Sequence, residues 1–533
     1  MLTRLVKRIC AILIKAGKED IDSTDPGQKG LIPISPNLQS NERYIRDAFG
    51  NSSDLVFRRI DPCGYRVLVA HIDGLVDTQA VSENVLRQIN RLSSVHPPSI
   101  RVFQDVLENT ITTTQVQKIN NMVDLLNRIS RGHTVIIIHG LDRALACDMK
   151  HWHERQVDEA KGEATIRGSR EGFVENIRTN TTLIRRRITD PRLWIKQLDL
   201  GSISHTQVAF AYIKGVASDE LVNEVEKRLN TIETDSIQES GHLEELFEDA
   251  PWSPFPTLLR TERLDRVVGA LFEGRLAIIT DGTPFVLIAP VSFHTFLVAS
   301  EDYFERWVAG SLLRPFRMIV FLVSLFLPAL YVAITSYHHE MLPTTLLLRL
   351  AAQREGVPFP AVAEALLMEV IFELLREAGI RLPRIIGPAI SIVGVLIIGQ
   401  TAVDVGLVSP TMVIVVALTA IASFATPGFS LAVTTRILRV PMVLLAGTLG
   451  LFGVFWGALA VLAHLVTLRS LGVPYLEPLA PTVVSEMKDV LFRAPWWAMD
   501  TRPEFTSGTR EKRQPPDTMP KPTNPRDMGG REP

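Results

Sequence analysis

The stretch MIVFLVSLFLPALYVAITS, at residues 318–336, contains nineteen residues and no charge. A helix rises about 1.5 Å per residue, so about 20 apolar residues are needed to cross the hydrocarbon layer of a membrane. The stretch therefore predicts a transmembrane helix, and Pro328 is expected to kink this helix rather than abolish it. Three further apolar runs predict spans at residues 385–403, 411–429 and 440–467.

Residues 362–377 differ from these runs, because their charges fall on one stripe of an otherwise apolar helix. Three glutamates recur at every fourth position of this amphipathic helix, and two further polar residues lie at the end of the second apolar run. The candidate pore or ion-path residues are Glu369, Glu373, Glu377, Gln400 and Asp404. If several copies surrounded a pore, rings of carboxylates would concentrate cations. The alternative is a helix at the membrane interface whose charged face lies in water, with the other two residues as a polar cap.

The last apolar run is rich in glycine. Its candidate helix-packing positions are Gly447, Gly450, Gly453 and Gly457. Glycine lets helices approach closely, and the last two of these residues form a G-x-x-x-G pattern. The pattern favours assembly into a homo-oligomer within an all-α transmembrane domain over residues 314–470.

Upstream of the membrane segments, strand-like apolar runs alternate with helical patterns, which is typical of α/β units. Strands are expected at residues 66–72, 134–139, 207–213, 275–280 and 284–289, and the clearest helices at 79–92 and 218–230. A break near residues 187–197 divides this region into two α/β subdomains, at 45–194 and 195–300. The predicted fold class is thus an α/β soluble N-terminal region of two subdomains, followed by an all-α helical transmembrane domain.

Three other segments complete the predicted organisation. Residues 1–44 form a basic start and a disordered linker, and residues 471–501 form a C-terminal segment. Residues 502–533 are rich in proline and charge, which predicts a disordered tail.

Composition and motifs exclude several functions. The 56 Lys+Arg are balanced by 58 Asp+Glu, so no basic field exists to hold nucleic acid. The chain has no phosphate-binding loop, zinc-protease motif, complete nucleophile elbow or dinucleotide fingerprint. Cys10, Cys63 and Cys147 fit neither a disulfide framework nor a zinc site. The sequence therefore predicts no enzyme activity, no cofactor and no metal.

Residues 167–188, RGSREGFVENIRTNTTLIRRRI, concentrate charge. They form either an exposed helix with an arginine cluster or a docking surface for another subunit. The candidate docking residues are Arg167, Arg170, Glu171, Glu175, Arg178, Arg185, Arg186 and Arg187.

Five strings of the sequence resemble the hallmark segments of the spore germinant receptor A subunits, the GerA family. They are the segment at 167–188, ERLDRVVGALFEGRLAIITDGTPFVLIAP at 262–290, AAQREGVPFPAVAEALLMEVIFELLREAGIRLPR at 351–384, SPTMVIVVALTAIASFATP at 409–427 and RAPWW at 493–497. The likeness extends from about residue 54 to residue 503, in the same order throughout. The first forty residues contain no family string, and the tail is longer than the family leads us to expect.

The resemblance implies a multi-pass subunit in the inner membrane of a dormant spore. Such A subunits act with a transporter-like B subunit and a lipoprotein C subunit, and are thought to oligomerise into a nutrient-gated channel for monovalent cations. A paralogous branch with the same architecture, the stage V sporulation AF-type proteins, would instead supply an accessory channel. A non-conducting scaffold or signalling subunit is a further alternative. A secondary transporter is disfavoured, because the chain shows no paired halves with broken helices.

Overall fold

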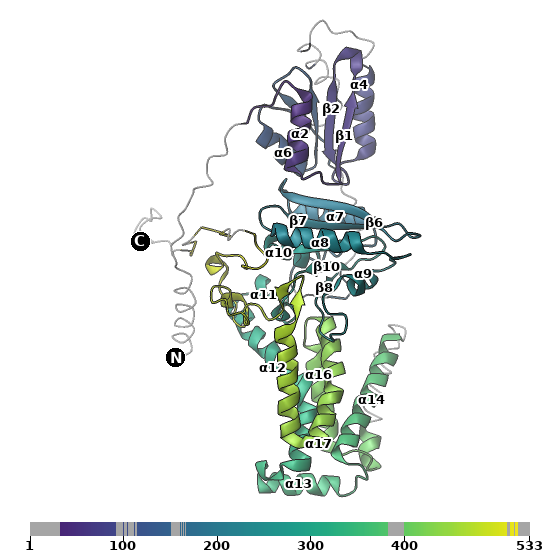
Figure 1. Ribbon diagram of the computed structural model, residues 1–533, viewed down its shortest axis with the longest axis vertical. Helices are drawn as coiled ribbons and strands as arrows, with labels where there is room; N and C mark the ends of the chain where they lie inside the picture. Colours follow the sequence, from purple (N-terminus) through teal and green to yellow (C-terminus); the bar gives the residue numbers. More distant parts are fainter. Residues whose placement is uncertain are drawn as a thin grey trace, which may run out of the picture.

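The computed structural model of the protein describes residues 32–91, 115–150, 167–381 and 399–508, with a few further positions between 100 and 165 and between 512 and 520. These residues form an elongated molecule, with two sheet-containing subdomains at one end and a bundle of helices at the other (Figure 1). The predicted fold class is confirmed.

The first subdomain is a five-stranded sheet in the order β1-β2-β4-β5-β3, with antiparallel neighbours. Its described elements are α2 (Leu38–Ala48), β1 (Leu55–Ile60), η1 (Pro62–Gly64), β2 (Val67–Ile72), α3 (Thr78–Val81), η2 (Ser82–Leu86), α4 (Arg87–Arg91), β3 (Val116–Ile119), α6 (Met122–Ser130), β4 (His133–Ile138) and β5 (Ala144–Asp148). Leu68 and Ala70 of β2 join a core with α2 and α6, whereas Val67 and Val69 join a core with α3, η2 and α4. Because side chains alternate along a strand, a sheet covered on both faces has continuous apolar strands.

The second subdomain has the same connectivity, with its strands in the order β6-β7-β9-β10-β8 and again antiparallel. Its elements are α7 (Ile177–Arg187), β6 (Leu193–Leu200), β7 (Thr206–Ile213), α8 (Asp219–Thr231), α9 (Ser240–Phe247), β8 (Leu259–Thr261), α10 (Leu264–Phe272), β9 (Leu276–Thr280) and β10 (Val286–Ala289). One core lies under α7 and α10, and the other under α8 and α9. The expected helix at 218–230 is α8, and the hydroxyl of Ser218 accepts a hydrogen bond from the Glu220 amide as its N-cap.

The limits of the two subdomains differ from the sequence prediction. Leu183 and Ile184 of α7 are buried in the core of the second sheet, so α7 belongs to the second subdomain and not to the first. The predicted break near residue 190 is a tight turn, in which the Leu193 amide donates to the Asp190 carbonyl. The first subdomain likewise begins before residue 45, because Ile34 and Leu38 are part of its core.

The helical region follows two short elements, η5 (Phe293–Phe296) and α11 (Glu301–Phe304). It contains α12 (Trp307–Tyr337), η6 (His339–Met341), α13 (Thr344–Arg354), α14 (Ala361–Arg381), α16 (Pro410–Phe424) and α17 (Phe429–Thr467). Among the described residues, α12 and α17 are long and apolar enough to cross a membrane. The expected span at 318–336 lies inside α12, and the one at 440–467 inside α17.

Neither of the other two expected spans coincides with a single described helix. The run at 411–429 contains most of α16, a shorter apolar helix of 15 residues, then a connection at 425–428 and the first residue of α17. Residues 385–398 of the run at 385–403 lie outside the described residues, and residues 399–403 are helical. The amphipathic helix expected at 362–377 is contained in α14.

Helix α17 turns back on itself at Gly450, whose backbone angles of φ 62° and ψ −142° are open only to glycine. A Cβ atom on Gly453 would lie 2.1 Å from the carbonyl oxygen of Leu445, and one on Gly457 would lie 2.5 Å from the sulfur of Met442. The residues before and after Gly450 are therefore in contact as two antiparallel arms. We refer to residues 429–449 as the first arm and to residues 451–467 as the second arm.

The chain after α17 returns to the second subdomain (Figure 1, yellow). It contains β11 (Arg469–Ser470), β12 (Val473–Pro474), η7 (Met487–Asp489) and η8 (Trp496–Ala498). The predicted tail begins too early, because residues 502–508 pack against the subdomain: the Ser218 amide donates to the Thr506 carbonyl, and Ser507 bridges to Ala217. Residues 521–533 lie outside the described residues.

Candidate functional site

The predicted carboxylate stripe of α14 is paired with arginines. The Glu369 carboxylate lies 2.7 Å from the guanidinium of Arg439, and the Glu373 carboxylate lies 2.9 Å from that of Arg436. Both arginines belong to the first arm of α17, and their order shows that the two helices run antiparallel. Glu377 pairs with Arg381 of its own helix, at 2.6 Å.

These pairs differ in burial. The Arg439 side chain is 2% exposed and that of Glu369 is 14% exposed, whereas the Glu373 side chain is 51% exposed. A half-exposed ion pair contributes about 0–1 kcal/mol, because water and salt screen it. Removing one partner of a buried pair instead costs about 3–5 kcal/mol. The Glu369–Arg439 pair is therefore a fixed joint, while the Glu373–Arg436 pair can exchange for water at small cost.

Arg439 also explains how α12 accommodates Pro328. A proline lacks the N–H group that would bond to the carbonyl of the fourth residue before it, which is Ser324. The Nε atom of Arg439 donates to that carbonyl at 2.9 Å, in a buried position. The same guanidinium thus satisfies a backbone acceptor of α12 and a carboxylate of α14, and it joins three helices.

Glu364 is a buried carboxylate that the sequence reasoning missed. It is fully buried, and its Oε1 atom accepts hydrogen bonds from the backbone N–H and the hydroxyl of Ser409, both at 2.5 Å. Its Oε2 atom has no hydrogen-bond partner among the described residues, and Arg354 Nε lies 3.9 Å from the carboxylate. Glu364 does not lie on the face that carries Glu369, Glu373 and Glu377. Glutamate is also common in the first turn of a helix, so the sequence carries no signal for its burial.

Gln400 and Asp404 lie in the helical residues 399–404, before α16, and both are exposed. Two residues further on, Gly406 approaches the carbonyl of Gly356, just before α14 begins. The structure therefore places Asp404 near the start of α14, whereas Glu377 is close to the other end of that helix. The five candidate ion-path residues are not gathered at one point in a single chain.

The four predicted packing glycines all lie against neighbouring groups. A Cβ atom on Gly447 would meet Val362 of α14, and one on Gly450 would meet Tyr337 and His338 at the end of α12. Gly453 and Gly457 face the first arm of the same hairpin. Within one chain these glycines pack helices of that chain together, and the structure contains no second copy to show a role between chains.

The arginine-rich segment at 167–188 makes several contacts within the chain. Arg185 is 1% exposed; its Nε donates at 2.7 Å to the carboxylate of Asp54, and another guanidinium nitrogen donates at 3.0 Å to the Ser52 hydroxyl. It joins the two subdomains and is not available to another subunit. Arg178 pairs with Asp73 and Arg187 with Glu171.

The other docking candidates lie nearer the surface. Arg186 is 3.8 Å from Glu171 and Arg167 is 3.6 Å from Glu305. Arg170 and Glu175 are exposed.

The start of α12 is clamped by the C-terminal segment. Asp302, which is fully buried, accepts from Arg317 at 2.6 Å and from Arg314 at 3.4 Å. Arg314 also reaches Asp489 of the C-terminal segment at 2.7 Å, and Arg493 donates at 2.8 Å to the Asp302 carbonyl.

Arg493 opens the RAPWW string, and Trp496 of that string packs edge-on against Tyr303 at 6.3 Å. The string therefore holds the C-terminal segment against the chain just before α12. We refer to these contacts around Asp302 and Asp489 as the α12 clamp.

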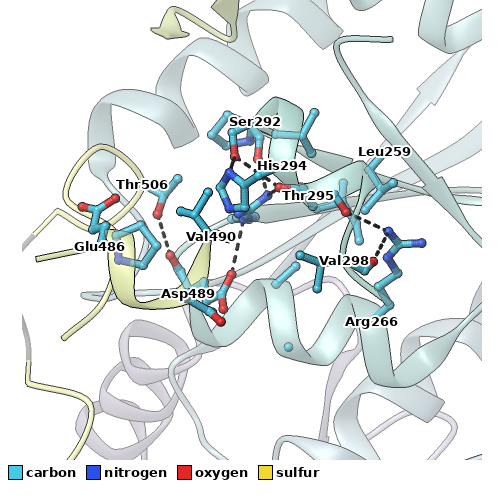
Figure 2. A pocket seen from close by; sticks show the side chains of 18 of the residues that line it. Leu259, Arg266, Ser292, His294, Thr295, Val298, Glu486, Asp489, Val490 and Thr506 are labelled. Atoms are coloured by element: carbon cyan, nitrogen blue, oxygen red, sulfur yellow. Dashed lines mark hydrogen bonds and ion pairs between the residues drawn. The ribbon is translucent and has the colours of Figure 1, made fainter. Parts of the chain in front are cut away.

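Beside this clamp lies a cavity of about 250 Å³, shown in Figure 2. The ring of His294 is next to Ser292, and its Nδ1 atom is 3.1 Å from the Glu477 carbonyl. Burial lowers the pKa of His294 to about 3, so its ring is neutral. Burial and the neighbouring Glu486 raise the pKa of Glu477 to about 8. The cavity wall therefore holds a carboxyl group that is mostly protonated at neutral pH.

The fold and these sites define a class of protein: two paired sheet-containing subdomains joined to a charged helical bundle, in which two described helices are long and apolar enough to cross a membrane. The GerA family of Bacillus and Clostridium spore germination proteins matches residues 43–505. The chain is 44% identical over 498 residues to spore germination protein KA of Bacillus subtilis, covering 93% of this chain and 91% of that protein. It is 39% identical over 477 residues to spore germination protein GerLA of Bacillus cereus, covering 89% and 96% of the two chains.

A further relative, the uncharacterized membrane protein YfkQ of Bacillus subtilis, is 41% identical over 486 residues and covers 90% of this chain and 93% of that protein. Among solved structures, the N-terminal domain of the A subunit of the Bacillus megaterium spore germinant receptor GerK3 is 34% identical. It covers 50% of this chain and 99% of that domain, with a TM-score of 0.41.

The chain belongs to the GerA family of spore germination proteins. It is a membrane protein and not an enzyme, and it acts in spore germination as a receptor A subunit. This membership implies B-type and C-type subunits as its partners.

Proposed function

We propose that the chain oligomerises in the spore inner membrane into a nutrient-gated cation channel, with the carboxylates of α14 along the ion path. The B-type subunit would be transporter-like and the C-type subunit a lipoprotein. Monovalent cations would leave the spore through this channel when nutrient binds to the receptor.

The observation that supports this proposal is the uneven packing of α14. Its buried residues are confined to its first two turns, Ala361, Glu364, Ala365 and Met368. Beyond them the helix exposes apolar side chains such as Leu374, at 65%, between its half-exposed carboxylates. A membrane helix with a face of mixed apolar and charged residues needs protein or a water-filled space beside it. Neighbouring copies of the chain around a central path would supply both.

The pairing of the stripe suggests how such a channel would stay closed. In one chain Glu369, Glu373 and Glu377 each have an arginine partner, so the stripe carries little net charge. Opening would separate Glu373 from Arg436, which is inexpensive for a half-exposed pair. The buried Glu369–Arg439 joint would hold the N-terminal half of α14 in place while its C-terminal half moves.

The same pairings favour a second candidate function, a non-conducting scaffold or signalling subunit. Carboxylates that stay bound to arginines have no charge to offer to passing cations. In that case the ion pairs would serve only to pack α14 against α17.

The two functions are separated by potassium release from liposomes that contain the purified chain, alone and then with its B and C partners and nutrient. The test variant is Glu373→Gln with Glu377→Gln, and the matched control is Glu340→Gln, an exposed carboxylate after α12. A channel lined by the stripe predicts release by wild type and control, with less release or weaker preference for cations in the test variant. Equal release by all three would move the ion path elsewhere. No release under any condition would refute the channel and leave the scaffold.

A further inference from the structure

The loop between α9 and β8 carries an apolar side chain that is almost fully exposed. Its residues 250–256 read APWSPFP, and Trp252 is 97% exposed, the highest value for a large apolar side chain in the described residues. Phe255, three residues later, is buried in the core of the second subdomain. Three prolines fix backbone angles in this short stretch, so the loop presents Trp252 on a stiff support.

The loop is bound to both arms of α17. The Thr434 hydroxyl of the first arm donates to the Pro254 carbonyl. The Ser253 hydroxyl lies 2.8 Å from Nε2 of His464 in the second arm. A shallow hollow beside these contacts is lined by Pro254 and by Phe429, which is itself exposed. The loop is therefore held against the membrane helices and does not lie free above them.

The length of the first arm gives the depth of the loop. At 1.5 Å per residue, Thr434 lies about 24 Å from Gly450 along the helix. The hydrocarbon layer of a bilayer is about 30 Å thick. The Gly450 end carries the exposed Trp456, and the exposed Tyr337 of α12 lies against Gly450; tryptophan and tyrosine are the residue types enriched at a membrane–water interface. With that end at one interface, the loop bound to Thr434 lies at the boundary of the opposite leaflet.

We propose that Trp252 inserts into the headgroup and acyl-chain boundary of the lipid bilayer and anchors the second subdomain to the membrane surface. An indole suits this position, because its ring is apolar while its N–H group can bond to water or to a headgroup. The occupant is lipid because the loop is continuous with the membrane helices and reaches the level where lipid surrounds them. The anchor does not depend on whether the chain conducts ions.

The test uses the full chain in phosphatidylcholine and phosphatidylglycerol vesicles whose acyl chains carry bromine, which quenches nearby indoles. The chain has seven tryptophans, so the Trp252 signal is the difference between wild type and Trp252→Phe. The matched control is the difference between wild type and Trp194→Phe. The Trp194 indole donates to the Ala48 carbonyl at the junction of the two subdomains.

We expect the Trp252 emission to be quenched by bromine and shielded from aqueous iodide, and the Trp194 emission to be unaffected by bromine. Bromine near the headgroups should quench Trp252 more strongly than bromine near the chain ends, because indoles sit at the headgroup level. Quenching of Trp252 by iodide alone would place the loop in water and overturn the proposal. Protection from both quenchers would overturn it too, because a second copy of the chain would then cover Trp252.

Discussion

Replacing Arg439 by methionine should destabilise the membrane helices more than any other single change in the stripe. Methionine replaces the apolar stem of the side chain but has no guanidinium, so it leaves two groups without a partner. One is the carboxylate of Glu369, and the other is the Ser324 carbonyl that Pro328 cannot bond.

The expected loss follows from these two groups. Removing one member of a buried ion pair costs about 3–5 kcal/mol. Within this loss, the orphaned carbonyl accounts for about 1–3 kcal/mol, which is the usual cost of an unsatisfied buried acceptor. Pro328→Ala returns an N–H group to α12, and this group can bond to Ser324. In the Arg439→Met background, Pro328→Ala should therefore restore about 1–3 kcal/mol, whereas in wild type the gain should be smaller because the Ser324 carbonyl already accepts from Arg439.

The free energy of unfolding can be measured for the four chains of this cycle by titrating the purified protein with SDS and following helix content by circular dichroism. Arg436→Met is the matched control, because Arg436 is one turn from Arg439 and its partner Glu373 is half exposed. We expect the control to lose no more than about 1 kcal/mol. If Pro328→Ala has the same effect in both backgrounds, Arg439 does not serve the Ser324 carbonyl, and the proposed joint of three helices is refuted.

Three further changes test the rest of the structure. Arg185→Met should lower stability by about 3–5 kcal/mol and speed tryptic cleavage between the subdomains, because it leaves a buried carboxylate unpaired; unchanged digestion would contradict the joint. The pKa of Glu477 is raised to about 8 in the folded chain, so its stabilising effect is complete below its unfolded pKa of about 4.3 and is lost as pH rises to about 8. The melting temperature should therefore fall between pH 5 and 8 in wild type and stay flatter in Glu477→Gln; parallel curves would exclude this carboxyl. Gly453→Leu should separate the arms of α17, since its Cβ would meet the Leu445 carbonyl, and should cost at least about 1–3 kcal/mol in SDS titration, whereas Gly356→Ala has open space and should be neutral.

Much of the soluble fold could be predicted from the sequence, because each subdomain is built from local signals. The continuous apolar strands and the Ser218 cap each depend on a few neighbouring residues. Strand order and the position of α7 could not be predicted in this way. A helix and the strand after it can belong to the same core or to different ones, and only long-range packing decides between them. The identical connectivity of the two subdomains was also hidden, since it concerns topology and not spacing.

The membrane site was predictable as a pattern but not as a set of contacts. The stripe of Glu369, Glu373 and Glu377 is visible from helical periodicity. Its partners Arg436 and Arg439 are sixty or more residues away, in the short segment between the predicted spans at 411–429 and 440–467. Positively charged residues near a span are usually read as topology signals. Here Arg439 is structural, because the Glu369 carboxylate and the Ser324 carbonyl, which Pro328 cannot bond, both need a donor.

These contacts define a physical route from the soluble subdomains to the stripe. The second subdomain holds α12 through the clamp at Asp302, and it holds α17 through the loop that bonds to Thr434 and His464. From α17 the route continues through Arg439 and Arg436 to α14. A rotation of the second subdomain would therefore act on α12 and α17 together, and α14 would respond through its two arginine partners. The buried Glu369–Arg439 pair resists separation, whereas the Glu373–Arg436 pair, with its half-exposed carboxylate, does not. The same rotation should therefore hold the start of α14 and release its end.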